Sequence, residues 1–299
     1  MEDTEQSQSV LVITGMHRSG TSLAASLLQS SGVFIGDRLM NGGTGNSKGH
    51  FEDWDFVDLH RDCLTNQATN REGWTTETDF SFSGEYLERV RNLIAARVKY
   101  PIWGWKDPRT TLFLDAWGQL IPQAKFIFIY RSPWDVVDSL FRRGDSIFKT
   151  DPEIAIKTWL SYNLAILKFC HQTDRPWLLL RIEDVIHRPQ LVVNTINQEF
   201  KLNLRSPQNL YDQSLFKASE VNLHRAALIQ QYFPHAFNLY LQLNQQATLL
   251  EKSSPTIEPH LTQLLWFLQN WHQPLVQVRT LRSWSKLKRV VIRKQLKFD

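Results

Sequence analysis

The stretch Val10–Leu28, which reads VLVITGMHRSGTSLAASLL, constrains the fold more than any other part of the chain. Its apolar, mostly β-branched start, Val10–Ile13, predicts a buried strand over Val10–Thr14. A loop bounded by Gly15 and Gly20 follows, and an apolar-periodic helix then runs from Thr21 to about Ser30. Strand, glycine loop and helix in this order make an anion cradle, because the glycines permit a tight turn and the helix start adds positive dipole. The stretch predicts a phosphate-binding loop; a generic turn without a ligand is the alternative.

The loop nearly matches the Walker pattern G-x-x-x-x-G-K-[ST], except that Thr21 stands at the lysine position. A nucleoside triphosphatase needs that lysine on the β- and γ-phosphates, which counts against a kinase or NTPase with an altered loop. The segment Arg18-Ser19-Gly20-Thr21-Ser22 instead resembles the 5′-phosphosulfate loop of sulfotransferases that use 3′-phosphoadenosine-5′-phosphosulfate (PAPS). In that family a basic residue precedes Ser-Gly-Thr. The resemblance implies that Arg18, Ser19, Gly20, Thr21 and Ser22 bind PAPS.

The size and composition of the chain fit one large α/β domain, since 42% of its 299 residues are hydrophobic. The formal net charge of +4 is too small to indicate nucleic-acid binding. Cys63 and Cys170 lack zinc-ligand spacing and predict reduced, buried thiols. Met1–Ser9 is polar and predicts a disordered leader rather than a signal peptide. No apolar run approaches membrane-spanning length, so we expect a soluble, cytoplasmic protein.

A long loop rich in Gly, Asn and Ser is predicted over Gly36–Gly49, after a short second strand at Val33–Ile35. Both a functional lid and a plain surface connection remain open for this loop. A helix is predicted to follow, starting at His50 and ending at Gln67. In several sulfotransferase branches a glutamate from the corresponding region serves as the base. The resemblance implies that Glu52 is the catalytic base, with His50 as the second candidate.

The other acidic residues at this helix start have a plainer expected role. Asp53, Asp55 and Asp58 are expected on a solvated face, since acidic residues near a helix N-terminus are favourable partners of its dipole.

An aromatic-rich strand, Ile102–Trp105, ends in Lys106-Asp107-Pro108-Arg109, where the proline prevents simple continuation. A lysine at the carboxyl end of a strand faces the ligand crevice of an open α/β sheet. Several sulfotransferases, including those that act on protein tyrosine, look similar here. The resemblance implies that Lys106 stabilises charge on the oxygen that bridges phosphate and sulfate. The structural alternative is a lysine ion-paired with Asp107 or another carboxylate.

The nearly all-apolar segment Ala124–Tyr130 predicts a central strand that is covered on both faces. In a P-loop NTPase such a strand commonly delivers an aspartate for magnesium. Here Arg131 follows the strand and Ser139 follows eight residues later on a predicted helix. This spacing resembles the 3′-phosphate motif of sulfotransferases, and an arginine fork with a hydroxyl suits a phosphate dianion. The resemblance implies that Arg131 and Ser139 bind the 3′-phosphate; a structural ion pair of Arg131 is the alternative.

The segment Trp177–Ile182 predicts another central strand, followed by Glu183 and Asp184. Many sulfotransferases carry a tyrosine before this acidic pair that contributes to adenine binding. This sequence has Ile182 at that position, which leaves the adenine contact open to an aromatic residue from elsewhere in the chain.

Beyond about residue 206 the pattern is helical, with amphipathic segments at Ser219–Gln246 and His260–Trp271. The last stretch, Arg279–Asp299, carries many Lys and Arg among apolar residues and predicts a basic amphipathic helix. Such a helix can make weak contact with an anionic membrane surface, and it is more often a solvated face; both interpretations remain open.

The predicted fold is a three-layer α/β sandwich with a central parallel sheet, like that of P-loop nucleotide kinases, plus carboxyl-terminal helices. We expect a core over residues 10–205 and a helical extension over residues 206–299. The resemblance implies an enzyme that moves the sulfuryl group of PAPS to an acceptor hydroxyl, such as one on a carbohydrate. Adenosine 3′,5′-bisphosphate would leave, no metal would be needed, and Arg18 and Lys106 would neutralise developing charge. A non-catalytic scaffold with this fold is the second alternative.

Overall fold

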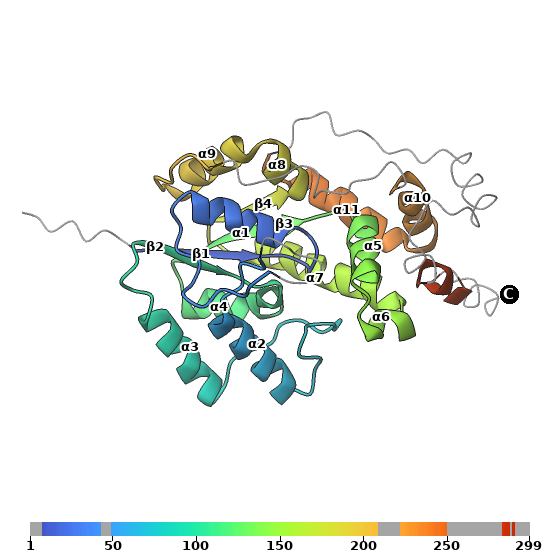
Figure 1. Ribbon diagram of the computed structural model, residues 1–299, viewed down its shortest axis with the longest axis horizontal. Helices are drawn as coiled ribbons and strands as arrows, with labels where there is room; N and C mark the ends of the chain where they lie inside the picture. The colour runs from blue at the N-terminus through green and yellow to red at the C-terminus, as the bar shows by residue number, and fades with distance from the viewer. Residues whose placement is uncertain (1–7, 43–48, 209–221, 250–282, 288, 291–299) are drawn as a thin grey trace, which may run out of the picture.

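The structure is a computed structural model that describes residues 8–42, 49–208, 222–249, 283–287 and 289–290 (Figure 1). Its centre is a four-stranded sheet in which neighbouring strands run parallel, in the order β2-β1-β3-β4. The strands are β1 (Ser9–Thr14), β2 (Ile102–Lys106), β3 (Lys125–Tyr130) and β4 (Trp177–Arg181). The predicted α/β fold with a central parallel sheet is confirmed.

Side chains alternate between the two faces of this sheet, and helices cover both faces. On one face, Leu11 and Ile13 of β1 pack in a single apolar cluster with Ile127 and Ile129 of β3. The helices that contribute to this cluster are α1 (Thr21–Ser30), α8 (Ile182–His187) and α9 (Pro189–Phe200). They form the upper layer in Figure 1.

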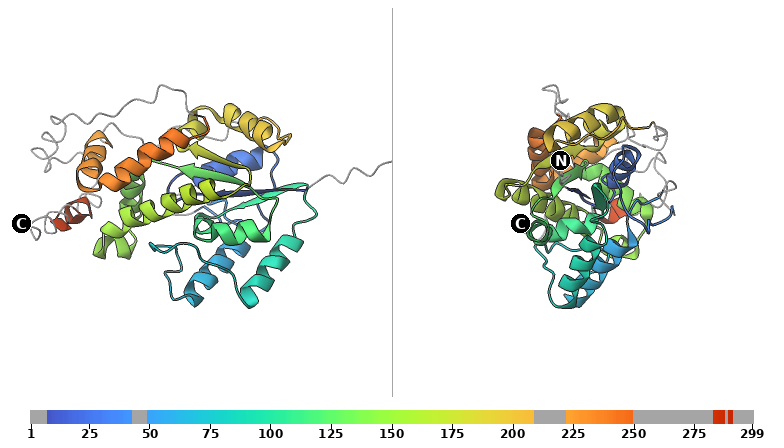
Figure 2. Two further views of the ribbon diagram at one scale, coloured as in Figure 1. Left: turned by 180° about the vertical axis from the view of Figure 1, so that it is seen from behind. Right: turned by 90° about the vertical axis from the view of Figure 1, so that its left-hand side faces the viewer.

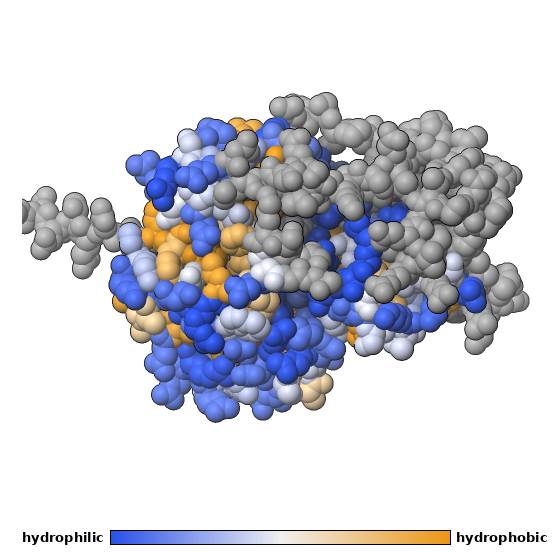
Figure 3. Space-filling model, in the orientation of Figure 1, coloured by the Kyte–Doolittle hydropathy of each residue, from blue (hydrophilic) through white to orange (hydrophobic). Residues whose placement is uncertain are grey.

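The opposite face carries the larger, aromatic cluster. Val12 of β1, Trp105 of β2 and Phe128 of β3 are fully buried in it. Its helical contributors are η1 (Pro108–Phe113, a 3₁₀ helix), α2 (Trp54–Asn66), α3 (Glu85–Ala95), α4 (Leu114–Leu120), α5 (Pro133–Arg143), α6 (Ser146–Thr150), α7 (Glu153–Gln172), α10 (Asn222–Tyr232) and α11 (Pro234–Gln246). Figure 2 shows the sheet between these two helical layers. The surface over α2 and α3 is mostly hydrophilic, as Figure 3 shows.

The sheet order determines where the predicted site residues meet. In a parallel sheet the carboxyl ends of neighbouring strands lie at one edge. β1 lies between β2 and β3, so the loop after β1 has the residues after β2 on one side and those after β3 on the other. Segments separated by about a hundred residues of sequence therefore share one end of the sheet.

The prediction of a helix starting at His50 is wrong at that end, because α2 begins at Trp54. Asp53 is the residue that caps the helix: its backbone is extended, and its carboxylate accepts a hydrogen bond from the backbone N–H of Asp55. Phe51 has a φ of 52°, which lies outside the right-handed helical region, so Phe51 cannot be part of α2. Glu52 therefore lies in the connection before the helix rather than on it.

The expectation that Asp53 is solvated is also wrong, since its side chain is fully buried. It accepts a hydrogen bond of 2.6 Å from Nη2 of Arg97, and Asp55 accepts a second one of 3.0 Å from the same atom. An unpaired carboxylate would not be stable at this depth, so the buried arginine accounts for the placement.

The prediction of a second strand at Val33–Ile35 is wrong as well, because only Phe34 makes a bridge, to Trp103 of β2. Two hydrogen bonds hold it, from the N–H of Phe34 to the carbonyl of Ile102 and from the N–H of Gly104 to the carbonyl of Phe34. Val33 and Ile35 are nonetheless buried. Their apolar character serves the core without extending the sheet.

The described carboxyl-terminal helices α10 and α11 pack on α5 and α7, at the right of Figure 1. A short helical turn over residues 283–287 adds Trp284, whose ring centroid lies 5.3 Å from that of Phe141. The predicted helix at His260–Trp271 lies outside the described residues, as do most of Arg279–Asp299 and residues 43–48 of the glycine-rich loop. The proposed leader lies outside them too, except for its last two residues, of which Ser9 begins β1.

Within the described ranges, no helix combines the length and the apolar character that crossing a bilayer requires.

Candidate active site

The phosphate loop between β1 and α1 is held tightly by its two glycines. A Cβ on Gly15 would lie 2.1 Å from the carbonyl oxygen of Ile129 in β3. Gly20 caps α1 with a φ of 94°, and a Cβ there would lie 2.1 Å from Cδ1 of Ile182. Only glycine permits both this close approach and this backbone conformation. The loop is thus fixed against β3 and α8 as well as against its own helix.

The serine of the loop has the environment of an anion ligand. Ser19 is fully buried, and its Oγ has no hydrogen-bond partner among the residues that the structure describes. Thr21 is buried at the first position of α1, and Ser22 is half-buried beside it. Buried hydroxyls are normally satisfied, and a helix N-terminus attracts negative charge. The residues present therefore fit a phosphate-like group.

Arg18 joins this loop to the segment after β3. Its Nε donates a hydrogen bond of 2.9 Å to Oγ of Ser139, which lies on α5. Burial, together with the positive charges of the neighbouring Arg143 and Arg131, lowers the pKa of Arg18 to about 10. Arg18 therefore remains a cation at neutral pH, in a site where positive charge has been concentrated.

Arg131 and Ser139 come from the end of β3 and the helix that follows it. Pro133 opens α5, which places Ser139 in the second turn. The backbone carbonyl of Arg131 accepts a hydrogen bond of 3.1 Å from Nε1 of Trp159. Nε of the Arg131 side chain lies 3.7 Å from Oδ2 of Asp135. The structure brings Arg18, Arg131 and Ser139 to the same end of the sheet.

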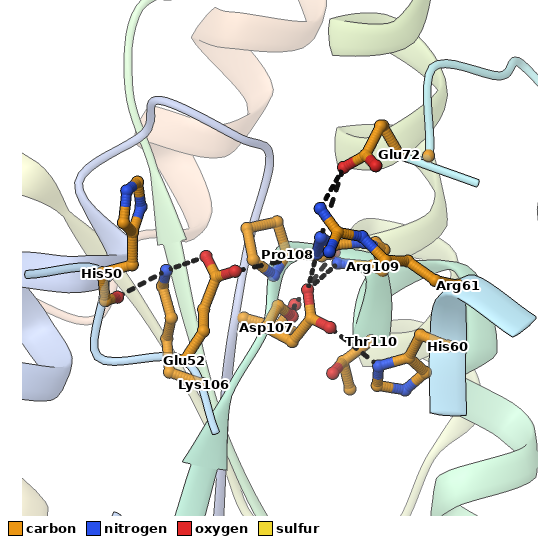
Figure 4. A network of polar contacts seen from close by, with 12 residues as sticks. His50, Glu52, His60, Arg61, Glu72, Lys106, Asp107, Pro108, Arg109 and Thr110 are labelled. Carbon is orange, nitrogen blue, oxygen red and sulfur yellow. Dashed lines mark hydrogen bonds and ion pairs between the residues drawn. The ribbon is translucent and has the colours of Figure 1, made fainter. Parts of the chain in front are cut away.

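Lys106 and Glu52 form a buried ion pair on the other side of the loop (Figure 4). Nζ of Lys106 donates a 2.6 Å hydrogen bond to Oε1 of Glu52 and a 3.0 Å hydrogen bond to the backbone carbonyl of His50. The carboxylate that pairs with this lysine is thus Glu52 and not Asp107. The structure places two of the three residues that the family resemblance assigned to catalysis, Lys106 and Glu52, in direct contact.

Asp107 and Arg109 make a second buried ion pair, which the sequence analysis did not assign to the site. Nη1 of Arg109 lies 2.6 Å from Oδ1 of Asp107 and 3.8 Å from Oε2 of Glu52. Burial alone would lower the pKa of Arg109, but Asp107 and Glu52 outweigh it and raise the pKa. Burial would raise the pKa of Asp107, but Arg109 and His60 hold it well below its usual range. Both groups are charged at neutral pH.

A model of the sulfotransferase family matches residues 11–207 of this chain. The chain belongs to the sulfotransferase family. Two similar solved structures are the sulfotransferase STF1 from Mycobacterium tuberculosis, at 18% identity over 71% of each chain with a TM-score of 0.45, and the sulfotransferase domain of the olefin synthase from Synechococcus PCC 7002, at 14% identity over 94% of each chain with a TM-score of 0.42. No curated protein matches the chain.

His50, the second candidate base of this sulfotransferase, lies on the side of Lys106 opposite Glu52 (Figure 4). It is half-buried, and burial lowers its pKa. Lys106 and Arg18 act in the same direction, while Glu52 opposes them. The imidazole of His50 is therefore mostly uncharged at neutral pH and remains chemically able to accept a proton.

Ile182 has a structural role in this sulfotransferase. It is buried in the cluster of α1, α8 and α9 and supports the phosphate loop beneath Gly20. The position that carries an adenine-binding tyrosine in many family members thus belongs to the core here. The sequence departure at this position follows from the way α8 packs against the loop.

Proposed function

We propose that this sulfotransferase moves the sulfuryl group of PAPS to a hydroxyl of its acceptor. The observation that carries the proposal is the hydrogen bond between Arg18 and Ser139. It joins a loop suited to a 5′-phosphosulfate with an arginine–serine pair suited to a 3′-phosphate. Two anion sites in contact at one end of a sheet fit a ligand that is phosphorylated at both ends, which supports PAPS over a nucleotide with a single phosphate chain.

The loop residues and the end of β3 would share the donor. Ser19, Gly20, Thr21 and Ser22 would hold the phosphosulfate with the first N–H groups of α1, and Arg131 with Ser139 would hold the 3′-phosphate. The Oγ of Ser19, which has no hydrogen-bond partner in the described part of the chain, supports this assignment. When bound, PAPS supplies an activated sulfuryl group, and adenosine 3′,5′-bisphosphate is the product that departs.

Glu52, Lys106 and Arg18 would perform the chemistry. Glu52 would take the proton of the acceptor hydroxyl as general base. Lys106 and Arg18 would stabilise negative charge as it develops on the departing side, in a site where burial strengthens each charge–charge interaction. The 2.6 Å contact between Lys106 and Glu52 supports this division of roles, because both side chains already share one site.

We propose a carbohydrate hydroxyl as the first acceptor class to test; that choice rests on the range of acceptors in the family and not on a residue of this chain. The competing function is that of a kinase or NTPase. The threonine at position 21 and the arginine at position 131 count against it, because neither can replace the phosphate-binding lysine or the magnesium-binding aspartate.

A thermal-shift comparison tests the donor. Adenosine 3′,5′-bisphosphate at a hundredfold excess over its Kd should stabilise the folded protein by about 2.7 kcal/mol. ATP with magnesium at the same concentration should have little effect. The opposite pattern would favour the kinase, and stabilisation by neither would remove the basis for a nucleotide site. Transfer of radioactive sulfate from PAPS to a panel of mono- and oligosaccharides then tests the reaction; donor binding without transfer to any acceptor would favour the scaffold.

A further inference from the structure

Arg109 lies at the centre of a buried network of charges next to Lys106 and Glu52 (Figure 4). We propose that Arg109 is a positioning residue that aims the carboxylate of Glu52 at the acceptor hydroxyl. This inference rests on the proposed function, because it takes Glu52 as the base. It assigns to Arg109 a task that is distinct from binding the donor.

The contacts of Arg109 divide between two ends of its planar guanidinium. Nη1 lies 2.6 Å from Oδ1 of Asp107 and 3.8 Å from Oε2 of Glu52. Nη2 lies 3.6 Å from Oε2 of Glu72. Lys106 holds the other oxygen of Glu52, Oε1. The two carboxylate oxygens of Glu52 therefore face two different cations, which restricts rotation of the carboxylate about its bond to the chain.

Asp107 fixes Arg109 and is itself fixed from behind. Its Oδ1 also accepts a 2.9 Å hydrogen bond from the backbone N–H of Arg109, and its Oδ2 lies 2.9 Å from Nδ1 of His60. Nε1 of Trp117 donates a 3.0 Å hydrogen bond to Nε2 of His60. An indole N–H can only donate, so the proton of this imidazole sits on Nδ1 and His60 donates to Asp107.

The outer side of the guanidinium is fixed by Glu72, in the connection between α2 and α3. Oε2 of Glu72 accepts a 2.7 Å hydrogen bond from Nη2 of Arg61. The next residue, Gly73, accepts a 3.1 Å hydrogen bond from the hydroxyl of Tyr162 on α7. Arg109 is thus held between a rigid buried aspartate and a surface carboxylate that is tied to two helices.

The charges of this inner network balance, which makes it stable at its depth. Lys106 and Arg109 offset Glu52 and Asp107, and all four side chains are at least nine-tenths buried. Buried ions persist only when each has a well-placed partner. Removing the arginine would leave a buried carboxylate unpaired, so a variant that retains the charge is the informative one.

Arg109→Lys retains the charge and removes the fork. A lysine offers a single point charge, which would stay with Asp107 and give up Glu52 and Glu72. We expect kcat for sulfuryl transfer to fall about tenfold to a hundredfold, because small displacements of a catalytic group cost rate on this scale. The Kd for adenosine 3′,5′-bisphosphate should stay unchanged, since Arg109 is assigned no donor contact. A rise in Kd that matches the loss in kcat would overturn the proposal.

A double variant tests whether Arg109 acts through Glu52. In a Glu52→Gln background, single-turnover transfer should not fall further when Arg109→Lys is added, because residues that act as one unit are not additive. If the rate losses of the two single variants multiplied in the double variant, Arg109 would have an independent role and the proposal would be overturned. Arg97→Lys is the matched control. The guanidinium of Arg97 is equally buried, with Nη2 2.6 Å from Oδ2 of Asp53 and 3.0 Å from Oδ2 of Asp55. Replacing it by lysine should leave kcat unchanged.

Two further measurements keep the proposal testable if Arg109→Lys folds poorly or if the proposed function fails. Glu72→Gln weakens only the outer anchor and should lower kcat less than Arg109→Lys does, again without a change in nucleotide Kd. A crystal structure of Arg109→Lys needs no activity: Glu52 should turn away from its wild-type position, and an unmoved carboxylate would overturn the proposal. Absence of any transfer by the wild-type protein would instead refute the proposed function.

Discussion

Nε of Arg18 and Oγ of Ser139 are 2.9 Å apart, although 121 residues separate them in the sequence. The contact exists because β1 and β3 are neighbours in a parallel sheet, so the loop that follows one strand meets the helix that follows the other. The residues of the proposed donor site therefore come from two loops that fold together.

We predict that Arg18→Ala lowers the rate of sulfuryl transfer by about a hundredfold or more, because it removes a partly buried cation from the place where charge develops. Single-turnover transfer from PAPS measures the effect. Arg38→Ala is a matched control, since Arg38 is an exposed arginine paired with Asp55. A normal rate in Arg18→Ala would refute the assignment.

Glu52→Gln should lose turnover while it still binds adenosine 3′,5′-bisphosphate. Glutamine has nearly the same shape and retains an oxygen for Lys106, but it cannot take a proton. Transfer assays and nucleotide titrations on the same preparation separate the two effects. Unchanged turnover would move the role of base to His50, and His50→Gln then serves as the direct test of that residue.

Gly20→Ala should destabilise the protein by about 1–3 kcal/mol and weaken donor binding, because the new Cβ would meet Ile182 in a strained backbone conformation. Gly144→Ala measures the cost of backbone strain alone, because Gly144 has a φ of 81° and the nearest atom to its added Cβ is 3.9 Å away. We expect Gly144→Ala to lower the free energy of unfolding by about 1 kcal/mol. Urea denaturation of both variants gives the comparison, and equal losses would show that the contact with Ile182 has no cost.

The stability of the protein should depend on pH through His17 in the phosphate loop. Burial lowers the pKa of His17 well below its usual value, and Arg109 and Arg143 lower it further. Below pH 6.5 the unfolded chain therefore binds a proton that the folded protein does not. The stability contributed by this residue then falls as the pH falls, by about 1.4 kcal/mol per pH unit, until the folded pKa is reached.

His17→Phe removes this titration and retains a ring against Trp74, whose centroid lies 4.5 Å from that of His17. Urea denaturation at pH 7.5 and pH 5.5 should show a smaller acid loss in the variant than in the wild type. His187→Gln, at an exposed position, should follow the wild type. Parallel curves for His17→Phe and wild type would refute the prediction.

Asp53→Ala should cost about 3 kcal/mol of stability, because it leaves Arg97 without its closest buried partner and removes the cap of α2. Asp58→Ala, in the same helix, should change stability by less than about 0.5 kcal/mol. Thermal or urea unfolding distinguishes them. If the two substitutions had equal effects, Asp53 would be as solvated as the sequence pattern suggested.

Local signals made the strand, the glycine loop and the helix of this region predictable from the sequence. The loop lies between the apolar run that forms β1 and the helix that starts at Thr21, and α1 has the predicted bounds, Thr21–Ser30. Each signal spans only a few residues, so no knowledge of distant contacts was needed. The family resemblance supplied the order of the motifs and, with it, the expected neighbours.

The charge network was not predictable in the same way. Arg109 and Glu52 are 57 residues apart, and Arg97 and Asp53 are 44 apart, so their pairing follows only from tertiary structure. One local signal was available, because an aspartate such as Asp53 is a favoured residue for the cap of a helix. With Asp53 as the cap, the helix begins after Glu52, and Glu52 lies in the connection before it.

The register of β2 against β1 determines which side chain reaches the site at the end of β2. Lys106 stands opposite Ile13, and Trp105 stands opposite Val12. A slip of one residue would send the lysine to the aromatic side of the sheet and present an indole in its place. A chain with the wrong register would thus have no ammonium group at this position, so it would be inactive rather than slow. Every molecule with the correct register has the lysine in place.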